Sequence, residues 1–170
     1  MSIPPNELPR RPHELGDEWV FGPDGQRFWG RFGAAGLLAW HPSLGVLLQL
    51  RATWSHFGGT WGLPGGARKL DESAIDGAMR EAFEEATVPI DAMRVIHESV
   101  LDLGFWTYTT VIAESLVEFD PVIADAESAA LRWVPLDEVD ALPLHPGFAT
   151  AWPDLRQYLT PPVDLTSPVE

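Results

Sequence analysis

The sequence predicts an α/β fold, in which helices cover both faces of a mixed β-sheet to form an α/β/α sandwich. Runs of β-branched, aromatic and apolar residues, typical of strands, are interrupted by one amphipathic helix and followed by further helical segments. Strands and helices in this order favour layers of helix packed on a sheet. The 170 residues, 45% of them hydrophobic, are enough for one domain with its own core.

Six segments have the composition of strands, and an uncharged run covers most of two of them. The predicted strands are residues 19–21, 32–40, 45–52, 95–101, 105–113 and 131–134. Residues 32–50 carry no formal charge, and these 19 residues approach the length of a membrane-spanning helix. Pro42 and Gly45 interrupt the run with the spacing of a turn. We therefore expect two buried strands joined by a hairpin, and no membrane segment.

The clearest helix covers residues 73–86. Ser73 and Asp76 have the spacing of a capping box at its start. Apolar residues then recur at helical spacing and give the helix a core face: Ile75, Met79, Ala82 and Ala86. A shorter helix is expected over residues 136–142, and another over residues 147–158 with a kink or break at Pro153.

Prolines gather at both ends of the chain, so regular structure is not expected there. We interpret residues 1–16 as an N-terminal Pro-rich arm, residues 17–158 as one domain and residues 159–170 as a C-terminal Pro-rich tail. The N-terminus lacks a charged segment followed by an apolar one, which argues against a secretory signal. A cytoplasmic location is therefore expected.

The charge balance excludes several classes of function. With 25 acidic and 11 basic residues, the formal net charge is -14, which argues against a nucleic-acid polymer or an anionic membrane as partner. The chain has no cysteine, so disulfides, thiolate metal sites and cysteine nucleophiles are excluded. If the substrate is an anion, positive charge must be recruited to receive it.

Three acids share one face of the predicted helix. Glu81, Glu84 and Glu85 lie at i, i+3 and i+4, near the helix C-terminus, where carboxylates repel one another and oppose the helix dipole. The set has two interpretations: ligands for a hard divalent cation, or an ordinary solvated acidic face. The preceding Gly-rich segment, residues 61–66, either lets backbone approach a ligand or forms a tight turn.

Taken together, these residues have a recognisable spacing. Gly66, Glu72, Arg80-Glu81 and Glu84-Glu85 read as G-x5-E-x7-R-E-x-x-E-E, preceded by Pro-Gly. This pattern resembles the Nudix box, the motif of the Nudix hydrolases, and it covers about 23 residues of the chain. Thr87 departs from the family pattern, which usually has Gly at the end of this helix. The departure concerns the exit of the helix and leaves the carboxylate set intact.

The resemblance implies a fold, a reaction and a metal. Nudix hydrolases cleave a nucleoside diphosphate linked to another moiety, using Mg²⁺ or Mn²⁺, so residues 17–158 would form a Nudix-type α/β/α sandwich. The match assigns metal ligation to Glu81, Glu84 and Glu85, with the Gly65 carbonyl as a backbone ligand. Arg80 would hold the carboxylates by charge-assisted hydrogen bonds, with Glu72 as its structural partner.

A similarity to MutT-type members extends the set outside the box. Those members have a further acid in a loop before a late-strand Trp, and here Glu127 precedes Trp133 with five residues between them. Asp125 is the alternative, and either acid can equally be a solvated loop residue. Which glutamate acts as general base stays open, because protons on such acids are coupled through the metal.

The same similarity suggests substrate-binding residues upstream of the box. Arg51 and His56 lie 14 and 9 residues before Gly65, where MutT-type members contact the nucleotide. Both are alternatively loop-surface side chains. Trp106 corresponds to an aromatic residue of the base pocket, or is a core aromatic of a strand.

The expected substrate is a small nucleotide, with a nucleoside triphosphate preferred. The asparagine with which MutT-type enzymes read oxidised guanine has no counterpart, because the only Asn is Asn6, and we expect His145 in that region to be a structural turn residue. The preferred function is therefore a nucleoside triphosphate pyrophosphohydrolase. The alternatives are a non-catalytic Nudix-fold nucleotide-binding or sensor module and an acidic docking surface. The aromatic-rich strands are compatible with a homodimer.

Overall fold

A mixed seven-stranded sheet forms the centre of the protein. The computed structural model describes residues 12–159. Its main sheet has the order β5–β4–β3–β8–β7, with β6 paired to β3 and β9 paired to β4. These strands are β3 (Ala34–His41), β4 (Gly45–Arg51), β5 (Trp61–Gly62), β6 (Gly65–Ala67), β7 (Met93–Asp102), β8 (Thr107–Ser115) and β9 (Ser128–Val134). β3 and β8 are parallel and the other pairs are antiparallel, which confirms the predicted mixed sheet.

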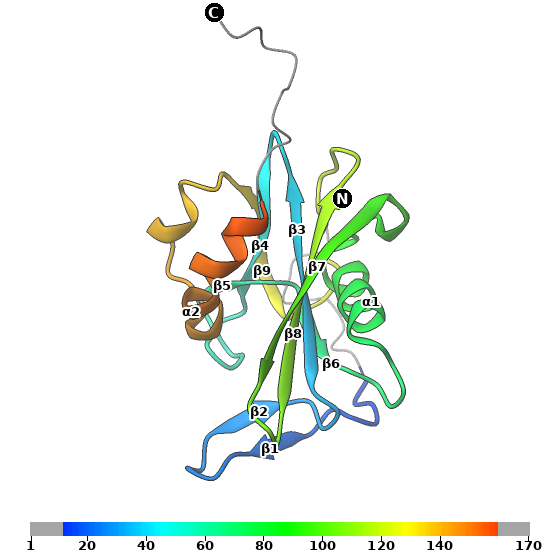
Figure 1. The fold of residues 1–170 in the computed structure, drawn as a ribbon, viewed down its shortest axis with the longest axis vertical. Coiled ribbons are helices and arrows are strands. Elements are labelled where there is room, and N and C mark those ends of the chain that lie inside the picture. The colour runs from blue at the N-terminus through cyan, green and yellow to red at the C-terminus, as the bar shows by residue number, and fades with distance from the viewer. Residues whose placement is uncertain (1–11, 160–170) are drawn as a thin grey trace, which may run out of the picture.

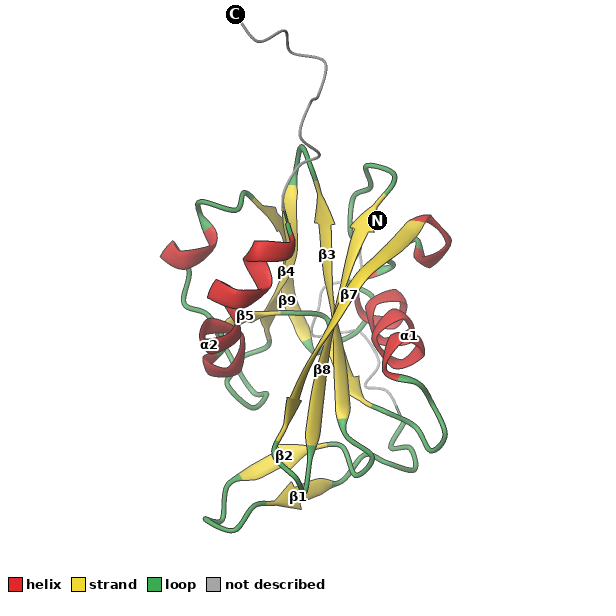
Figure 2. Cartoon of the chain, in the orientation of Figure 1, coloured by secondary structure: helices red, strands yellow, loops and turns green. Residues whose placement is uncertain are grey.

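Helices cover both faces of this sheet. α1 (Ala74–Ala86) and α2 (Pro146–Leu155) lie on opposite sides of β3 and β4 (Figures 1 and 2). The alternation of side chains along β3 divides the core between them. Leu37 packs in the same cluster as Ala82 of α1, whereas Leu38 packs in the cluster of Trp152 of α2. The α/β/α sandwich is therefore confirmed.

The ends of α1 are fixed by side-chain hydrogen bonds. Ser73 is the N-cap, and its hydroxyl accepts a hydrogen bond from the Asp76 N–H at 3.0 Å. Thr87 ends the helix in the left-handed conformation, with φ 53°, that glycine usually adopts. The Thr87 hydroxyl donates to the Ala86 carbonyl at 2.7 Å and accepts from the Val122 N–H at 3.2 Å. These bonds offset the steric cost of a β-branched residue there, so the helix ends where a glycine would end it.

Some elements differ from the prediction. The short strands β2 (Arg27–Trp29), β5 and β6 were not expected, because two or three residues give no periodicity to read. Only a 3-10 turn, η3 (Val139–Ala141), forms within the expected helix over residues 136–142. α2 is not broken at Pro153 and continues to Leu155, followed by η4 (Arg156–Tyr158). A further 3-10 turn, η2 (Ile90–Ala92), precedes β7.

A separate hairpin precedes the sheet. β1 (Trp19–Phe21) pairs antiparallel with β2 and lies at the lower end of the sheet in Figure 1. The Gly16 carbonyl accepts a hydrogen bond from the Arg31 N–H at 2.9 Å, which ties the start of the hairpin to its exit. Most of the expected arm and tail, residues 1–11 and 160–170, lies outside the described residues. Within residues 12–159, no helix has the length and apolar character needed to cross a membrane.

Candidate functional site

Glu85, in the last turn of α1, is the most deeply buried acid of the predicted set. Its side chain is 1% exposed. Oε2 accepts hydrogen bonds from Gln49 Nε2 and from the Gly65 N–H, each at 3.1 Å. Gln49 Nε2 also lies 2.6 Å from the Ser128 hydroxyl oxygen, its second acceptor. Gln49 and Ser128 were not predicted from the sequence. Gln49 and the Gly65 N–H hold one Glu85 oxygen in a fixed position, and Ser128 helps to fix Gln49.

Glu85 lies close to two further acids. One carboxylate oxygen from each of Glu85, Asp125 and Glu127 lies within 4.8 Å of the others, and we call these three residues the acid cluster. The Ala124 N–H donates to the Glu85 carbonyl at 3.1 Å, and the Glu127 N–H donates to Asp125 Oδ1 at 3.1 Å. The loop before β9 is thus tied to the end of α1. The structure brings Glu85 and Glu127 together. Asp125, the alternative to Glu127 in the sequence analysis, lies with them.

The chemistry of this donor set suits a hard cation. Three carboxylates offer oxygen ligands, which Mg²⁺ and Mn²⁺ prefer over nitrogen and sulfur. Asp125 and Glu85 are buried, whereas Glu127 is exposed, so the cluster is fixed on one side and open to water on the other. The residues therefore fit a divalent ion.

Arg80 organises the other acids of α1. Its Nε and Nη2 donate to the two oxygens of Glu72, at 2.7 and 2.9 Å, and its Nη1 donates to Glu81 Oε1 at 2.6 Å. Nη1 also reaches Glu84 Oε2 at 3.3 Å, and Nη2 donates to the Ala67 carbonyl at 3.1 Å. We call Arg80, Glu72, Glu81 and Glu84 the Arg80 network. Glu81 and Glu84, expected as metal ligands, are thus held beside the acid cluster by a guanidinium.

The charges in the Arg80 network stabilise one another. The hydrogen bond to Glu72, and then the one to Glu81, raises the pKa of Arg80 above its ordinary value. Burial alone would raise the pKa of Glu72, but hydrogen bonds from Arg80 and from the Lys69 N–H outweigh it and lower the pKa. Both groups therefore keep their charges, as the expected structural pairing of Glu72 with Arg80 requires.

The Gly-rich segment lets the acids of α1 approach backbone closely. β6 pairs with β3, and Gly65 lies opposite Gly36. A Cβ atom on Gly66 would lie 2.8 Å from the Glu81 carboxyl carbon, and one on Gly65 would lie 2.5 Å from the Ala35 carbonyl oxygen. The Gly-rich segment therefore contributes to two short strands, β5 and β6, and its close backbone contacts require Gly65 and Gly66. Gly65 reaches Glu85 through its N–H.

Arg51 and His56 lie together at the start of the loop after β4. Arg51 Nε donates to the His56 carbonyl at 2.8 Å. Burial lowers the pKa of His56, and the positive charges of Arg27 and Arg51 lower it further. The Ala52 N–H donates to the Glu127 carbonyl at 2.8 Å, so this loop begins next to the acid cluster.

Tyr108 was not predicted as a site residue. Burial raises its pKa to about 12, with smaller effects from Arg51, Glu85 and Glu81. A Cβ on Gly36 would lie 2.2 Å from its hydroxyl oxygen, so the ring is seated over β3. Tyr108 is the second residue of β8 and follows Trp106 by two positions, which is the only signal for it in the sequence.

Trp106 and His145 both have structural contacts. The Trp106 ring lies 4.7 Å from that of Phe28, and its indole N–H donates to the Trp29 carbonyl at 3.2 Å. His145 caps α2, with Nδ1 accepting from the Gly147 N–H at 3.1 Å. Burial, together with Arg51 and His56, lowers the pKa of His145 to about 4. His145 is thus the structural residue that was expected.

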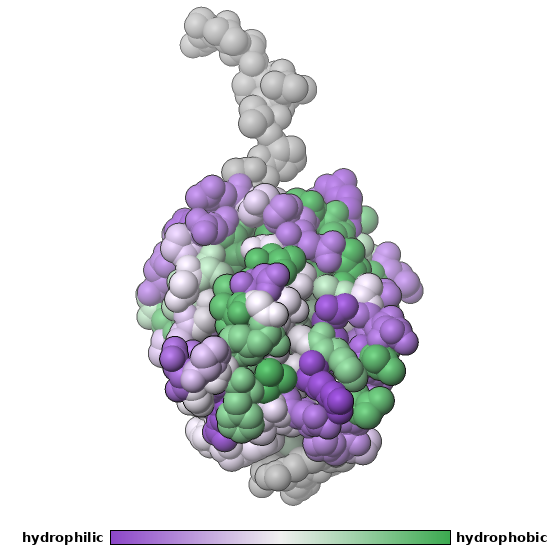
Figure 3. Space-filling model, turned by 60° about the horizontal axis from the view of Figure 1, so that its bottom comes forward, coloured by the Kyte–Doolittle hydropathy of each residue, from purple (hydrophilic) through white to green (hydrophobic). Residues whose placement is uncertain are grey.

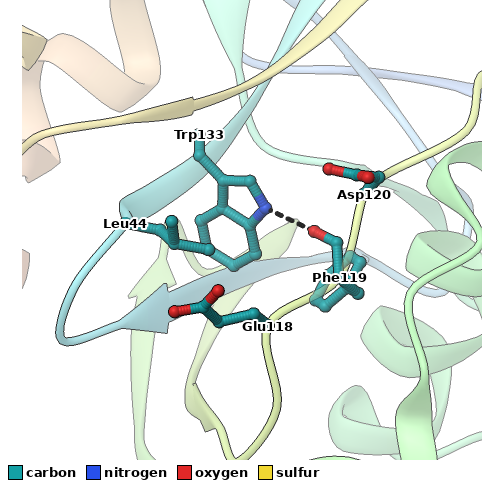
Figure 4. A pocket seen from close by; sticks show the side chains of 5 residues that line it. All are labelled: Leu44, Glu118, Phe119, Asp120 and Trp133. Carbon is teal, nitrogen blue, oxygen red and sulfur yellow. Dashed lines mark hydrogen bonds between the residues drawn. The ribbon is translucent and has the colours of Figure 1, made fainter.

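A hollow elsewhere on the surface is not part of this site. It has a volume of about 210 Å³ and is lined by Leu44, Glu118, Phe119, Asp120 and Trp133. The Trp133 indole N–H donates to the Phe119 carbonyl at 2.9 Å across it (Figure 4). Leu44 precedes β4, whereas Arg51 ends that strand, so the hollow lies at the opposite end of β4 from Arg51.

Comparison with known proteins agrees with this geometry. The NUDIX domain family matches residues 30–155. A Nudix hydrolase from M. smegmatis, RenU, is 50% identical over 84% of this chain and 94% of its own, with a TM-score of 0.75. A candidate 8-oxo-dGTP diphosphatase of Mycobacterium tuberculosis is 49% identical over 151 residues, 83% of this chain and 69% of that protein.

Two further similarities are more limited. A nucleoside triphosphate pyrophosphatase/Nudix hydrolase fusion protein of Bifidobacterium longum is 41% identical over 83% of this chain, which covers 31% of the fusion. A C. elegans Ap4A hydrolase, 19% identical over 74% of this chain and 97% of its own, has a TM-score of 0.61 and supports the fold alone. From the matched family, the identity to its members and the shared fold, we conclude that this chain belongs to the Nudix hydrolases, enzymes that act on phosphoanhydride bonds.

Proposed function

We propose that this chain is a divalent-metal-dependent nucleoside triphosphate pyrophosphohydrolase. The observation that carries the proposal is the acid cluster, in which three carboxylate oxygens lie within 4.8 Å of one another. The hydrogen bond from the Ala52 N–H to the Glu127 carbonyl brings the neighbouring residue, Arg51, close to this cluster. A sensor module would not need to keep these acids or the guanidinium that positions them.

Each residue has a defined task in this proposal. Glu85, Asp125 and Glu127 hold the ion, which when bound polarises a phosphate oxygen and lowers the pKa of a water molecule. Arg80 orients Glu81 and Glu84 beside it by charge-assisted hydrogen bonds. Gln49 and the Gly65 N–H fix one oxygen of Glu85. Arg51 provides a planar cation suited to phosphate oxygens.

The choice of substrate rests on the relatives. One is named for 8-oxo-dGTP and another for nucleoside triphosphates, so both classes belong among the candidate substrates. Magnesium or manganese is the expected ion. The cytoplasmic location and the homodimer are still predictions from the sequence alone.

A hydrolysis panel tests the proposal. Nucleoside triphosphates, 8-oxo-dGTP, ADP-ribose and dinucleoside polyphosphates are incubated with the protein and Mg²⁺ or Mn²⁺, and the products are separated. We expect metal-dependent release of pyrophosphate and a nucleoside monophosphate from a triphosphate. A protein that binds nucleotide but releases no product with either metal would instead be a sensor module.

A further inference from the structure

The β1–β2 hairpin precedes the part of the chain that matches the family. The match begins at residue 30, whereas the hairpin covers residues 19–29. The turn between β7 and β8 holds it in place. Phe105 and Trp106 both pack on Phe28, with ring centroids 5.7 and 4.7 Å away, and Trp106 donates to the Trp29 carbonyl. The hairpin is therefore a fixed part of the fold, at the lower end of the sheet in Figure 1.

One side of this hairpin contacts the nucleotide side of the site. Trp19 meets His56 edge to face, with ring centroids 5.3 Å apart, and it meets Trp29 at 5.0 Å. The Arg27 guanidinium lies over the Trp19 ring, 4.5 Å from its centroid. Because the His56 carbonyl accepts from Arg51, a continuous set of contacts runs from the hairpin to the residue next to the acid cluster.

Arg27 differs from Arg31, the cation that follows the hairpin. Within residues 12–159 Arg27 makes no ion pair, and its side chain is exposed, whereas Arg31 pairs with Glu18 at 3.6 Å. The charge of Arg27 nevertheless acts on His56. In a chain with a formal net charge of -14, Arg27 and Arg51 thus both place positive charge near His56, beside the half-buried ring of Trp19. Figure 3 turns this end forward and shows polar and apolar residues intermixed.

We propose that the hairpin is a wall of the nucleotide site and that Arg27, held over Trp19, binds the nucleobase. This inference rests on the proposed function. If the acid cluster binds the triphosphate through its ion, Arg51 lies beside the phosphates and the base extends toward the hairpin. A guanidinium stacks on aromatic faces and donates to base oxygens, and aromatic rings favour the same planar ligand. Trp19 is then the positioning residue of Arg27.

The test measures binding, not turnover. Isothermal titration with Mg²⁺ uses two probes: dGTP with a methylene bridge between the α- and β-phosphorus atoms, and tripolyphosphate, which has neither base nor sugar. We expect Arg27→Ala to weaken binding of the dGTP analogue about tenfold, the energy of about one lost stacking contact, and to leave tripolyphosphate within twofold. Arg31→Ala, with the same change in charge, should change neither. Trp19→Ala should resemble Arg27→Ala, and Trp19→Phe should restore part of the affinity.

Each outcome decides a different claim. Equal weakening of both probes by Arg27→Ala would place Arg27 on the phosphates and overturn the assignment to the base. If Arg27→Ala bound both probes as tightly as the wild type, the hairpin would not be a wall of the nucleotide site, and the hydrolase proposal would still stand. If the wild-type protein bound neither probe, the proposed function would fail. Thermal melting checks that each variant is folded. If Trp19→Ala does not fold, the result for Arg27→Ala alone decides the test.

Discussion

The acid cluster and the hairpin wall lie at two ends of one region, and different contacts build them. The cluster depends on one helix, whose last turn carries Glu85, and on a loop bonded to that turn. The wall depends on rings from segments distant in the chain: Trp19 meets His56, and Phe28 meets Trp106. Hydrogen bonds between mostly buried, charged side chains fix the Arg80 network beside the acid cluster. Contacts between half-exposed aromatic rings form the hairpin wall.

The two ends should therefore respond differently to single substitutions. The acid end is held in place by many hydrogen bonds, so single changes there should affect catalysis or folding strongly. The hairpin end is held by aromatic contacts, which contribute about 0.5–1.5 kcal/mol each beyond their buried area. Changes there should alter affinity and local pKa values while leaving the reaction intact.

The largest effect is expected at the acid cluster. Glu85→Gln should lower kcat/KM for a nucleoside triphosphate about 1,000-fold, because losing a charged metal ligand removes about 4 kcal/mol of transition-state stabilisation. Steady-state kinetics with product analysis measures it. Glu118 is an exposed acid at the hollow beside Trp133, so Glu118→Gln is the matched control and should stay within twofold. Equal losses in the two variants would show that the acid cluster has no special role.

The next effect concerns the Arg80 network. Arg80→Lys should lower the free energy of unfolding by about 1–3 kcal/mol, because a lysine ammonium cannot keep the paired hydrogen bonds to Glu72 and the bond to Glu81. Urea unfolding measures the change. In Arg94→Lys, the exposed pair with Glu114 is altered, and the expected change is below about 0.5 kcal/mol. A destabilisation of similar size in both would contradict the buried role of Arg80.

The start of α2 should be destabilised in acid through its N-cap, His145. Its folded pKa of about 4 lies below the ordinary value of 6.5, so between these pH values the unfolded chain binds more protons at this site. Its contribution to stability is therefore complete above about pH 6.5 and is lost as the pH falls toward 4. His145→Asn keeps an N-cap acceptor and should reduce this loss in urea titrations at several pH values. His13→Asn, an exposed histidine, should follow the wild-type profile.

The smallest effect is a change in the pKa of His56. Removing the positive charge in Arg27→Ala should raise the His56 pKa, because the protonated ring loses a repulsive neighbour. NMR titration of the histidine ring protons measures it, with Arg31→Ala as control. A His56 pKa that does not move would mean that Arg27 does not face the site in solution.

The two ends also differ in how much of them could be predicted. Helical spacing alone put Glu81, Glu84 and Glu85 on one face, and the resemblance to the Nudix box placed Gly65 and Arg80 beside them. Gln49 was not predicted, because its contact with Glu85 spans 36 positions in the sequence and depends on the register of β4. The contact of Trp19 with His56 requires the hairpin to be placed by Phe28, and no local pattern encodes that placement.

The central claim is that Glu85, Asp125 and Glu127 together bind the divalent ion that the reaction needs. Anomalous diffraction from crystals soaked in Mn²⁺ and the dGTP analogue tests it most directly. We expect a manganese peak within coordination distance of the carboxylates of these three residues, and we expect this peak to be lost in Glu85→Gln crystals. A peak only at other acids, such as Glu118 and Asp120, or a peak unchanged in Glu85→Gln, would contradict it.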